Sequence, residues 1–406
     1  MSDVTAVASS WTLRRTALLL AMAALACLLA GGEVWAQFEV PSLHPPEFFG
    51  EGGALSAAPA VRYNRVEGLF LGMQVTCRPT RRIGLSFPLM AGYGFNNKTW
   101  RYSVSVLQSF LKAEQLTLGA AYFDETASND GWRVRGTENS LAALLLKEDF
   151  MDYFGRKGWQ VYVNERFFGR HTARVVYATY DYQDMGKTEE LAGALFGGKK
   201  RFAPNPSITS GKEQSVKLIL ELDWRDSPLL PLEGTLVQAI YEKTWQDFST
   251  DGLFVSMIHF RPTFGDQRLV VRTIVGTRAG SVAPQHLMTM GGVGTLRAFR
   301  DGCQKGQNLA LFNAAYYFDN LLGKLLPRRG AEHDQLSLGV FFDAGSAWGR
   351  DKPKENLLSD LEGSTLLADA GISLLIADGI VRVDFARQVR GGEGSWRTTL
   401  RLLSVL

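Results

Sequence analysis

Alternation of apolar and polar side chains along short segments constrains the fold of this chain more than any other feature of its sequence. In segment 215–224 the apolar residues Val216, Leu218, Leu220, Leu222 and Trp224 share one side, and Lys217, Glu221 and Asp223 share the other. A period of two places alternate side chains on opposite faces of a β-strand. No stretch beyond the N-terminal segment reaches the roughly 20 apolar residues that a membrane helix needs. The pattern predicts an all-β protein, and by itself it fits a soluble sandwich as well as a membrane barrel.

The sizes of the side chains on the two faces favour the barrel. In segment 335–348 one face carries Leu336, Leu338, Val340, Phe342, Ala344 and Trp348, and the other carries Ser337, Gly339, Asp343, Gly345 and Ala347, with Phe341 as its one bulky member. A large apolar face toward lipid and a small or polar face toward a lumen is the arrangement of a transmembrane antiparallel β-barrel. Aromatic residues near the predicted strand ends are expected to form an interfacial belt. They are Tyr102, Tyr180, Tyr182, Trp348 and Trp396.

Fifteen strands can be placed along the sequence in this way. They span 62–76, 84–96, 100–110, 114–126, 158–168, 171–183, 213–225, 234–246, 252–264, 268–280, 307–319, 335–348, 366–377, 379–389 and 395–405. Bacterial single-chain barrels have an even number of strands, with short periplasmic turns and longer external loops. The long connections 127–157, 184–212, 281–306 and 349–365 fall at one end if one more strand precedes residue 127. We therefore predict sixteen strands, with the missing one in 38–82.

The N-terminal segment has the features of an export signal. Arg14 and Arg15 precede an uncharged run over 16–30, and Val34-Trp35-Ala36 offers small residues for cleavage. The apolar run is shorter than the roughly 20 residues of a membrane anchor. We expect a cleaved signal peptide over 1–36, a short periplasmic lead or plug rich in Pro, Gly and Ala over 37–61, and the barrel over 62–406. Only two cysteines, Cys77 and Cys303, follow the signal, so no disulfide framework is expected.

Two of the long connections have their own patterns. Residues 137–154 are predicted to be helical, with Leu141, Leu144, Leu145 and Met151 on one face and Thr137 as the cap. Residues 193–212 are rich in Gly, Lys, Pro and Ser and are predicted to form a flexible surface loop. The basic run Lys199-Lys200-Arg201 in that loop favours a solvated tip or a lipopolysaccharide contact over nucleic-acid binding.

Three further motifs cannot be explained by strand alternation alone. The stretch GGVGTLRAFRDG, residues 291–302, combines glycines that allow sharp turns with arginines that can pair with a carboxylate through two hydrogen bonds. The stretch DWRDSPLLPLEG, residues 223–234, places prolines and a final glycine where a short hairpin would close. The stretch FFDAG, residues 341–345, places an aspartate on the face already assigned to the lumen.

These three motifs, in this order, resemble the BamA/TamA superfamily of outer-membrane barrel insertases and translocators, the bacterial surface antigen family. The resemblance implies a Gram-negative outer-membrane protein in which one long external loop folds back into the lumen. The matching loop tip comprises Gly291, Gly292, Leu296, Arg297, Ala298 and Phe299, and the strand that holds its arginine comprises Phe341, Asp343 and Gly345. The matching periplasmic turn comprises Asp223, Arg225, Asp226, Pro231 and Gly234.

The chain also departs from the family pattern. Ala298 replaces a glycine of the tip, and although Asn313 matches a lumen position, Ala315 and Tyr317 stand where relatives often carry glutamate and arginine. The last residue is Leu406 rather than an aromatic residue. Residues 37–61 are too few for the periplasmic domains that usually precede such a barrel, so a barrel-only member is expected.

No enzyme signature is present, because the five histidines are scattered and no nucleophile elbow or phosphate loop occurs. We expect no catalysis, no cofactor, no metal and no nucleic-acid partner. The resemblance implies a monomer in contact with outer-membrane lipids and lipopolysaccharide, with unfolded outer-membrane proteins as candidate clients. Insertion or translocation would use a weak seam between 395–405 and a strand near 62–76. A passive channel or surface receptor, and a purely structural barrel, are the alternatives.

Overall fold

The computed structural model describes residues 54–79, 84–110, 115–186, 200–228, 231–265, 267–318, 336–349, 365–376 and 381–402. The first half of the wall is formed by β1 (Leu55–Asn64), β2 (Gly68–Cys77), β3 (Leu85–Gly94), β4 (Thr99–Phe110), β5 (Leu116–Ala127), β6 (Phe154–Phe167), β7 (His171–Gln183) and β8 (Gly211–Asp223). The second half is formed by β9 (Gly234–Gln246), β10 (Thr250–Pro262), β11 (Gln267–Gly280), β14 (Asn308–Phe318), β15 (Leu336–Trp348), β16 (Leu367–Ile376), β17 (Val381–Arg390) and β18 (Trp396–Leu402). The expected signal peptide and Leu406 lie outside the described residues.

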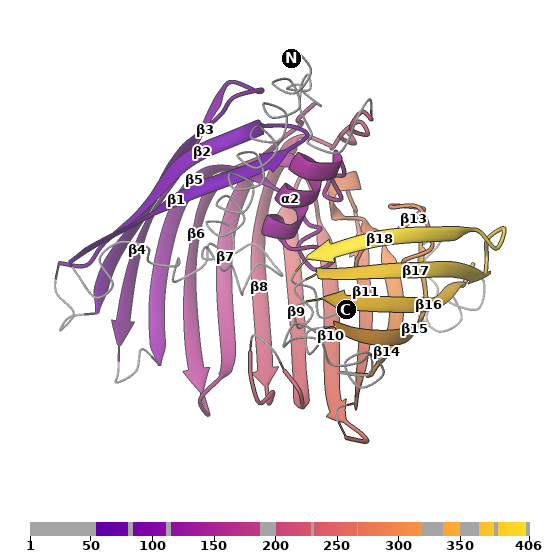
Figure 1. The fold of residues 1–406 in the computed structure, drawn as a ribbon. Coiled ribbons are helices and arrows are strands. Elements are labelled where there is room, and N and C mark those ends of the chain that lie inside the picture. Colours follow the sequence, from indigo (N-terminus) through magenta and orange to yellow (C-terminus); the bar gives the residue numbers. More distant parts are fainter. Residues whose placement is uncertain are drawn as a thin grey trace, which may run out of the picture.

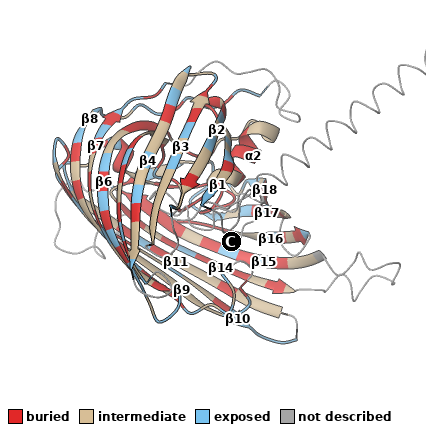
Figure 2. Cartoon of the chain, turned by 90° about the vertical axis from the view of Figure 1, so that its left-hand side faces the viewer, coloured by how far each residue is buried: buried red, intermediate tan, exposed pale blue. Residues whose placement is uncertain are grey.

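These strands form one antiparallel sheet of 16 strands, in which neighbours in the sheet are neighbours along the chain (Figure 1). The exception is the step from β11 to β14, because β12 (Met288–Met290) and β13 (Gln304–Gly306) form a separate two-stranded sheet. The predicted all-β barrel class with sixteen strands is confirmed. The sheet curves around an interior that the long connections enter (Figure 2).

The missing strand is β1, which lies before residue 127 as predicted. The expected strand over 62–76 was wrong, because a hairpin interrupts it between β1 and β2. The Oδ1 atom of Asn64 accepts hydrogen bonds from the backbone N–H groups of Val66 (3.0 Å) and Glu67 (2.7 Å), and Gly68 has φ +63°. Asparagine and glycine favour such tight turns. The wall therefore begins at Leu55, inside the range 37–61 that was expected to be a lead or plug.

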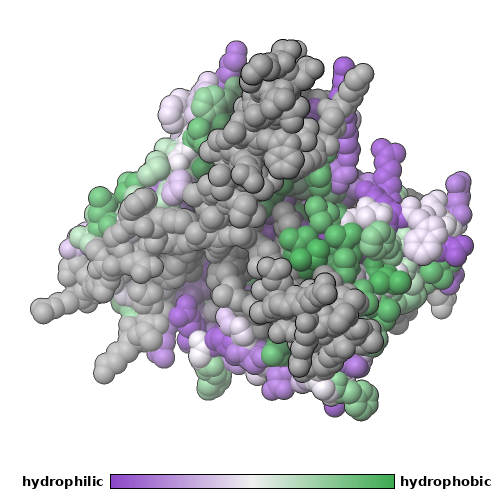
Figure 3. Space-filling view, in the orientation of Figure 1, coloured by the Kyte–Doolittle hydropathy of each residue, from purple (hydrophilic) through white to green (hydrophobic). Residues whose placement is uncertain are grey.

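The alternation of burial along the strands matches the predicted lipid and lumen faces. In β15, Val340 and Phe342 are 48% and 42% exposed, whereas Phe341 and Asp343 are buried. In β8, Leu218 and Leu220 are exposed, whereas Glu221 and Asp223 are buried. Figure 3 shows apolar side chains gathered over the C-terminal strands at the right of the view. Apolar residues thus cover the outside of the wall, and many of its charged residues face inward.

The predicted aromatic belt is only partly correct. Trp396 is 67% exposed, but Tyr180, Tyr182 and Trp348 are buried. Tyr180 and Tyr182 share the lumen face of β7 with Ala178, and they pack against Phe123, Phe154 and Phe248 in one apolar cluster. Their alternating position along β7 points both tyrosine side chains toward the lumen. Nearness to a strand end was therefore a poor indicator of a place at the membrane interface.

None of the helices in the described part of the chain is long and apolar enough to cross a membrane.

The predicted helix in the connection from β5 to β6 is present but shorter than expected. Helix α2 spans Gly136–Leu146, rather than 137–154, and Thr137 does not cap it. Lys147 ends the helix in the left-handed conformation, with φ +54°. The Asn139 side chain then binds Asp149 (2.8 Å) and the backbone N–H of Phe150 (2.8 Å). These contacts hold the following residues in a non-helical path.

The expected flexible loop over 193–212 is partly described, and its described part is anchored. Residues 193–199, including Lys199, lie outside the described residues. Asn205 is buried, and its side-chain Nδ2 donates to the carbonyls of Tyr153 (2.7 Å) and Met185 (2.6 Å). Lys200 forms an ion pair with Glu148. This part of the loop therefore packs on the segment that carries α2.

Candidate functional site

The motif at 291–302 forms the tip of a ribbon that turns back into the barrel. The strands β12 and β13 form the two sides of the ribbon, and the short helix η3 (Pro284–His286) precedes it. Gly291, Gly292 and Gly294 have φ values of +102°, +80° and +79°, which favour glycine. The predicted tip residues Leu296, Arg297, Ala298 and Phe299 are all buried. The tip is thus enclosed by the rest of the protein rather than exposed as a surface loop.

Arg297 lies at the centre of the contacts between the tip and the wall. Its Nε atom is 3.1 Å from Oδ2 of Asp343, the residue proposed as its partner from the motif. Its Nη1 atom is 3.3 Å from Oδ1 of Asp384 and 3.3 Å from Oγ of Ser373. The guanidinium carbon also lies 3.8 Å from the centroid of the Phe341 ring, within the range of a cation–π contact. One arginine therefore joins β15, β16 and β17.

The tip backbone makes further contacts that the sequence motif did not predict. The N–H of Ala298 donates to Oδ2 of Asp369 (2.9 Å), and Gln388 donates to the carbonyl of Ala298 (3.1 Å). Arg397 of β18 donates to the carbonyl of Phe299 (2.5 Å). These partners occupy lumen positions of β16 to β18, so period-two alternation was the only signal that could have pointed to them. Ala298 contributes through its backbone, which an alanine supplies as well as a glycine.

Two residues of the wall, Asn313 and Gly345, allow the ribbon to pack closely against it. Asn313 donates to the carbonyl of Thr295 (2.9 Å) and to Oδ1 of Asp343 (2.8 Å), so it joins the tip to its carboxylate partner. A Cβ atom on Gly345 would lie 3.0 Å from the Cε atom of Met290 in β12. The glycine of the FFDAG motif therefore leaves room for the ribbon to pack against β15.

The predicted turn motif forms the hairpin between β8 and β9, and the backbone N–H of Asp223 donates to Nδ1 of His171 in β7 (3.0 Å). The carboxylate of Asp223 accepts from Nε (2.9 Å) and Nη2 (3.0 Å) of Arg225. The Asp226 carboxylate accepts from the backbone N–H groups of Ser227 (2.8 Å) and Leu232 (3.0 Å). Gly234 has φ +106°, and Pro231 is buried beside it. These residues close the hairpin at the end of the barrel opposite the long connections.

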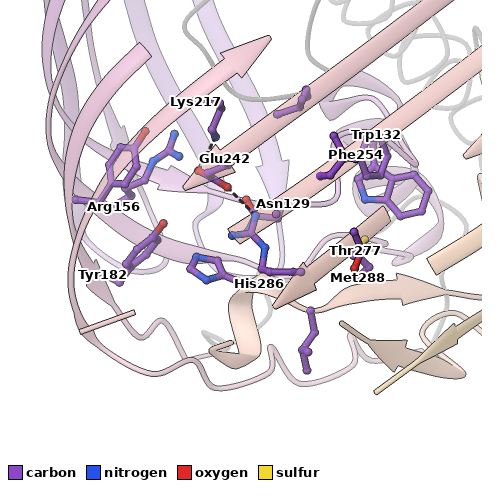
Figure 4. A pocket seen from close by; sticks show the side chains of 16 residues that line it. Asn129, Trp132, Arg156, Tyr182, Lys217, Glu242, Phe254, Thr277, His286 and Met288 are labelled. Atoms are coloured by element: carbon purple, nitrogen blue, oxygen red, sulfur yellow. Dashed lines mark hydrogen bonds and ion pairs between the residues drawn. The ribbon is translucent and has the colours of Figure 1, made fainter. Parts of the chain in front are cut away.

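A cavity of about 100 Å³ lies beside the ribbon and is lined by charged and aromatic residues (Figure 4). Glu242 pairs there with Lys217 (3.1 Å) and Arg278 (2.6 Å). His286 lies at the root of the ribbon, and burial together with the nearby charge of Arg278 lowers the pKa of His286 to about 3. Among the residues that the structure describes, no three His, Cys, Asp or Glu side chains group to hold a metal ion.

The seam between the first and last strands differs from the expected pairing of 395–405 with a strand near 62–76. Within the described residues, β1 pairs only with β2, and β18 pairs only with β17. Helix α2 packs against β1, and its Glu138 pairs with Arg401 of β18. Figure 1 shows α2 between the two ends of the sheet. The pairing prediction was wrong, because a helix lies where a strand ladder was expected.

The wall and the buried tip together define a class of protein, a membrane β-barrel with an external loop returned into its interior. The sequence matches the family model described as the Omp85 superfamily domain over residues 84–395. The chain therefore belongs to the Omp85 superfamily and is a bacterial outer-membrane protein, and the predicted family resemblance is confirmed. No curated protein matches the sequence.

Solved structures that match the chain include a BamA and two CdiB proteins. BamA from Haemophilus ducreyi, lacking POTRA domains 1–3, is 13% identical, with 86% of this chain and 69% of that chain covered and a TM-score of 0.57. CdiB from Acinetobacter baumannii is 12% identical, with 86% and 59% covered and a TM-score of 0.39. CdiB from Escherichia coli is 11% identical, with 86% and 62% covered and a TM-score of 0.41. The chain thus spans less than two thirds of either CdiB protein. The likeness to BamA concerns the fold.

Proposed function

We propose that this barrel assists the insertion or translocation of proteins at the outer membrane, and that it acts through the seam between β1 and β18. The observation that carries the proposal is the absence of a strand ladder between these two strands within the described residues. The edge of a β-strand presents backbone N–H and C=O groups to which another strand can add. A closed barrel has no such edges.

The buried loop tip supports a route through the seam over free passage along the lumen. Arg297 connects the tip to β15, β16 and β17, and Arg272 of β11, two strands before β15 in the sheet, donates to the carbonyl of Gly294. A lumen that contains such a tip is obstructed. The same contacts brace β15 to β17 next to the seam, so a client strand would add to an edge that is backed by a braced wall.

A passive channel is the second candidate, and the charged cavity beside the ribbon favours it. Arg156, Lys217, Glu242 and Arg278 line this cavity. Charged side chains that line a lumen tune which solutes pass. Lipids of the outer membrane and lipopolysaccharide are expected to surround the barrel in either case.

Liposomes with and without the purified full-length chain would test the two candidates. A urea-unfolded, eight-stranded outer-membrane protein is added, and its folding is followed by gel mobility without heating, while leakage of a small trapped dye is recorded. We expect client folding to accelerate about tenfold, the factor that corresponds to about 1.4 kcal/mol. Arg297→Ala should lose this acceleration.

The matched control is Arg174→Ala. Arg174 also faces the interior, where its Nε donates to Asn164 (3.1 Å), but it does not contact the tip. Both variants are compared at equal amounts of folded barrel. Unchanged client folding together with dye leakage would reject the insertion proposal and leave the channel.

A further inference from the structure

The connection from β5 to β6, residues 128–153, is here called the seam segment, and it contacts both ends of the sheet. At the β1 end, the backbone N–H of Tyr63 donates to Oγ of Ser140 (3.3 Å). The N–H of Arg65, in the turn that follows β1, donates to Oδ2 of Asp149 (2.8 Å). Two positions of the seam segment therefore bind backbone groups at the end of the first strand.

At the β18 end, the seam segment is held by a buried ion pair. Nε of Arg401 is 2.8 Å from Oε1 of Glu138, and Nη2 of Arg401 is 2.9 Å from Oε2. Each side chain is only 5% exposed. Such bidentate contacts fix orientation as well as position. The last strand and the helix thus meet through one well-defined pair, although 263 residues separate the partners.

The composition of α2 suits a helix enclosed between two sheet edges. Its first half, Gly-Thr-Glu-Asn-Ser, supplies the polar contacts, and its second half, Leu-Ala-Ala-Leu-Leu-Leu, is apolar. Residues 138–143 are all buried. Because the backbone groups of a helix bond within the helix, α2 cannot extend the ladder of either strand. A few side chains therefore occupy a place where a strand could form many backbone hydrogen bonds.

We infer that the seam segment is a built-in, displaceable occupant of the seam that blocks both strand edges until a client β-strand replaces it. This inference rests on the proposed function. The replacement exchanges side-chain contacts, including the packing of Val66 with Val134 and Met151, for a continuous backbone ladder, which an incoming strand can supply and a helix cannot. The Glu138–Arg401 pair is the latch that must separate.

The seam segment also contacts the ribbon, so displacement of the seam segment would break contacts near the loop tip. Nη1 of Arg133 lies 3.0 Å from Oδ1 of Asp301, and Nζ of Lys305 lies 2.7 Å from Oδ2 of Asp152. The seam segment therefore joins the two strand edges to the returned loop.

A crosslink across the latch tests this inference. Cys27, Cys77 and Cys303 are first replaced by serine in the full chain, and Glu138→Cys and Arg401→Cys are then introduced together. A short bis-maleimide joins the two new thiols, whereas the same variant without reagent has lost the latch. The matched control is Lys243→Cys with Asp251→Cys. These residues also form an ion pair (3.0 Å), but they are cross-strand neighbours in β9 and β10, which are already paired.

Client folding in liposomes is the first measurement. The uncrosslinked latch variant should fold the client at least as fast as its cysteine-free parent, and crosslinking should slow folding to the rate of empty liposomes, about tenfold. Crosslinking the control should change nothing. A crosslinked latch variant that still folds the client at the parental rate overturns the inference while leaving the proposed function intact.

Conductance in planar bilayers separates the inference from the proposed function. If the parent fails to accelerate client folding, the proposed function is rejected, and the inference is judged by openings alone. If crosslinking the latch abolishes the channel openings, the inference is supported. If crosslinking leaves the openings unchanged, the inference is overturned. If the double variant does not fold, Glu138→Gln replaces it. Hydrogen exchange over 136–146 should then rise about tenfold relative to wild type, and unchanged exchange counts against a releasable segment.

Discussion

The loop tip and the seam segment are both external connections that lie inside the barrel, yet the wall holds them differently. The tip is contacted from β11, β14, β15, β16, β17 and β18, and Arg297 alone reaches three of these strands. The seam segment meets β18 through Arg401 and the end of β1 through hydrogen bonds to Ser140 and Asp149. Release of the tip requires contacts to six strands to break together, whereas release of the seam segment from the sheet requires the contacts at its two edges to break. The comparison suggests one permanent and one releasable loop.

The largest effect is expected from breaking the permanent contact. Arg297→Ala would leave Asp343 and Asp384 buried beside an empty space, and removal of one partner of a buried ion pair typically costs about 3–5 kcal/mol. Urea titration of the barrel, followed by gel mobility without heating, should therefore show a much lower unfolding midpoint. Arg174→Ala serves as the control. Equal midpoints for the two variants would mean that the tip does not anchor the wall.

A second prediction concerns the place where the two loops touch. Gly294 has φ +79°, and a Cβ atom there would lie 2.1 Å from the carbonyl oxygen of Arg133 in the seam segment. Gly294→Ala should destabilise the barrel by about 1–3 kcal/mol, since it adds a collision to backbone strain. Gly302 has φ +66° but no atom nearer than 3.6 Å to such a Cβ. Gly302→Ala should therefore cost less, and the difference in urea midpoints measures the contact between the loops. If both variants lower the urea midpoint equally, backbone strain alone explains the loss of stability, and the contact between the loops does not contribute.

A third, smaller effect is expected at the seam segment itself. Asp152 bridges Nη2 of Arg65 (2.7 Å) and Nζ of Lys305 (2.7 Å), but its side chain is 36% exposed. Partly exposed ion pairs contribute about 1 kcal/mol or less, so Asp152→Asn should lower global stability only slightly. Hydrogen exchange over 148–153 should nevertheless quicken, while exchange at the tip should stay slow. Equal acceleration in both regions would contradict the division into a permanent and a releasable loop.

The sequence predicted the wall better than it predicted the contents of the lumen. Alternation placed Asp343 on the inner face, and the motif paired it with Arg297, as observed. Asp369, Ser373 and Asp384 also face inward, but period two indicates only a side of the strand and does not reveal which residue meets the tip. Local pattern likewise predicted a helix near 137–154. It could not indicate that Glu138 meets Arg401, because that contact depends on the curvature of the whole sheet.

The aromatic residues show the same limit. Tyr180 and Tyr182 lie near a strand end, which suggested a membrane interface, yet they pack inside against Phe123 and Phe248. An aromatic residue suits an apolar interior cluster as well as an interface. Only the direction of the side chain separates the two, and in β7 both tyrosines share the buried face with Val176 and Ala178.

The last prediction uses pH to test the root of the ribbon. Burial and the nearby charge of Arg278 lower the pKa of His286 to about 3. In the unfolded chain this histidine has a pKa of about 6.5, so between these values the unfolded state binds the extra proton. The contribution of neutral His286 to the free energy of unfolding is therefore complete above about pH 6.5 and is lost as the pH falls toward 3. The loss between pH 7 and pH 6 is about 0.7 kcal/mol. Urea titrations of wild type and His286→Gln at both pH values give the free energies of unfolding, and the loss between pH 7 and pH 6 should be about 0.7 kcal/mol larger in the wild type. Identical pH dependence in the two proteins would mean that the pKa of His286 is the same in the folded and the unfolded chain. A wild type that gains stability relative to His286→Gln at pH 6 would mean that Glu213, at 3.3 Å, holds the protonated imidazole.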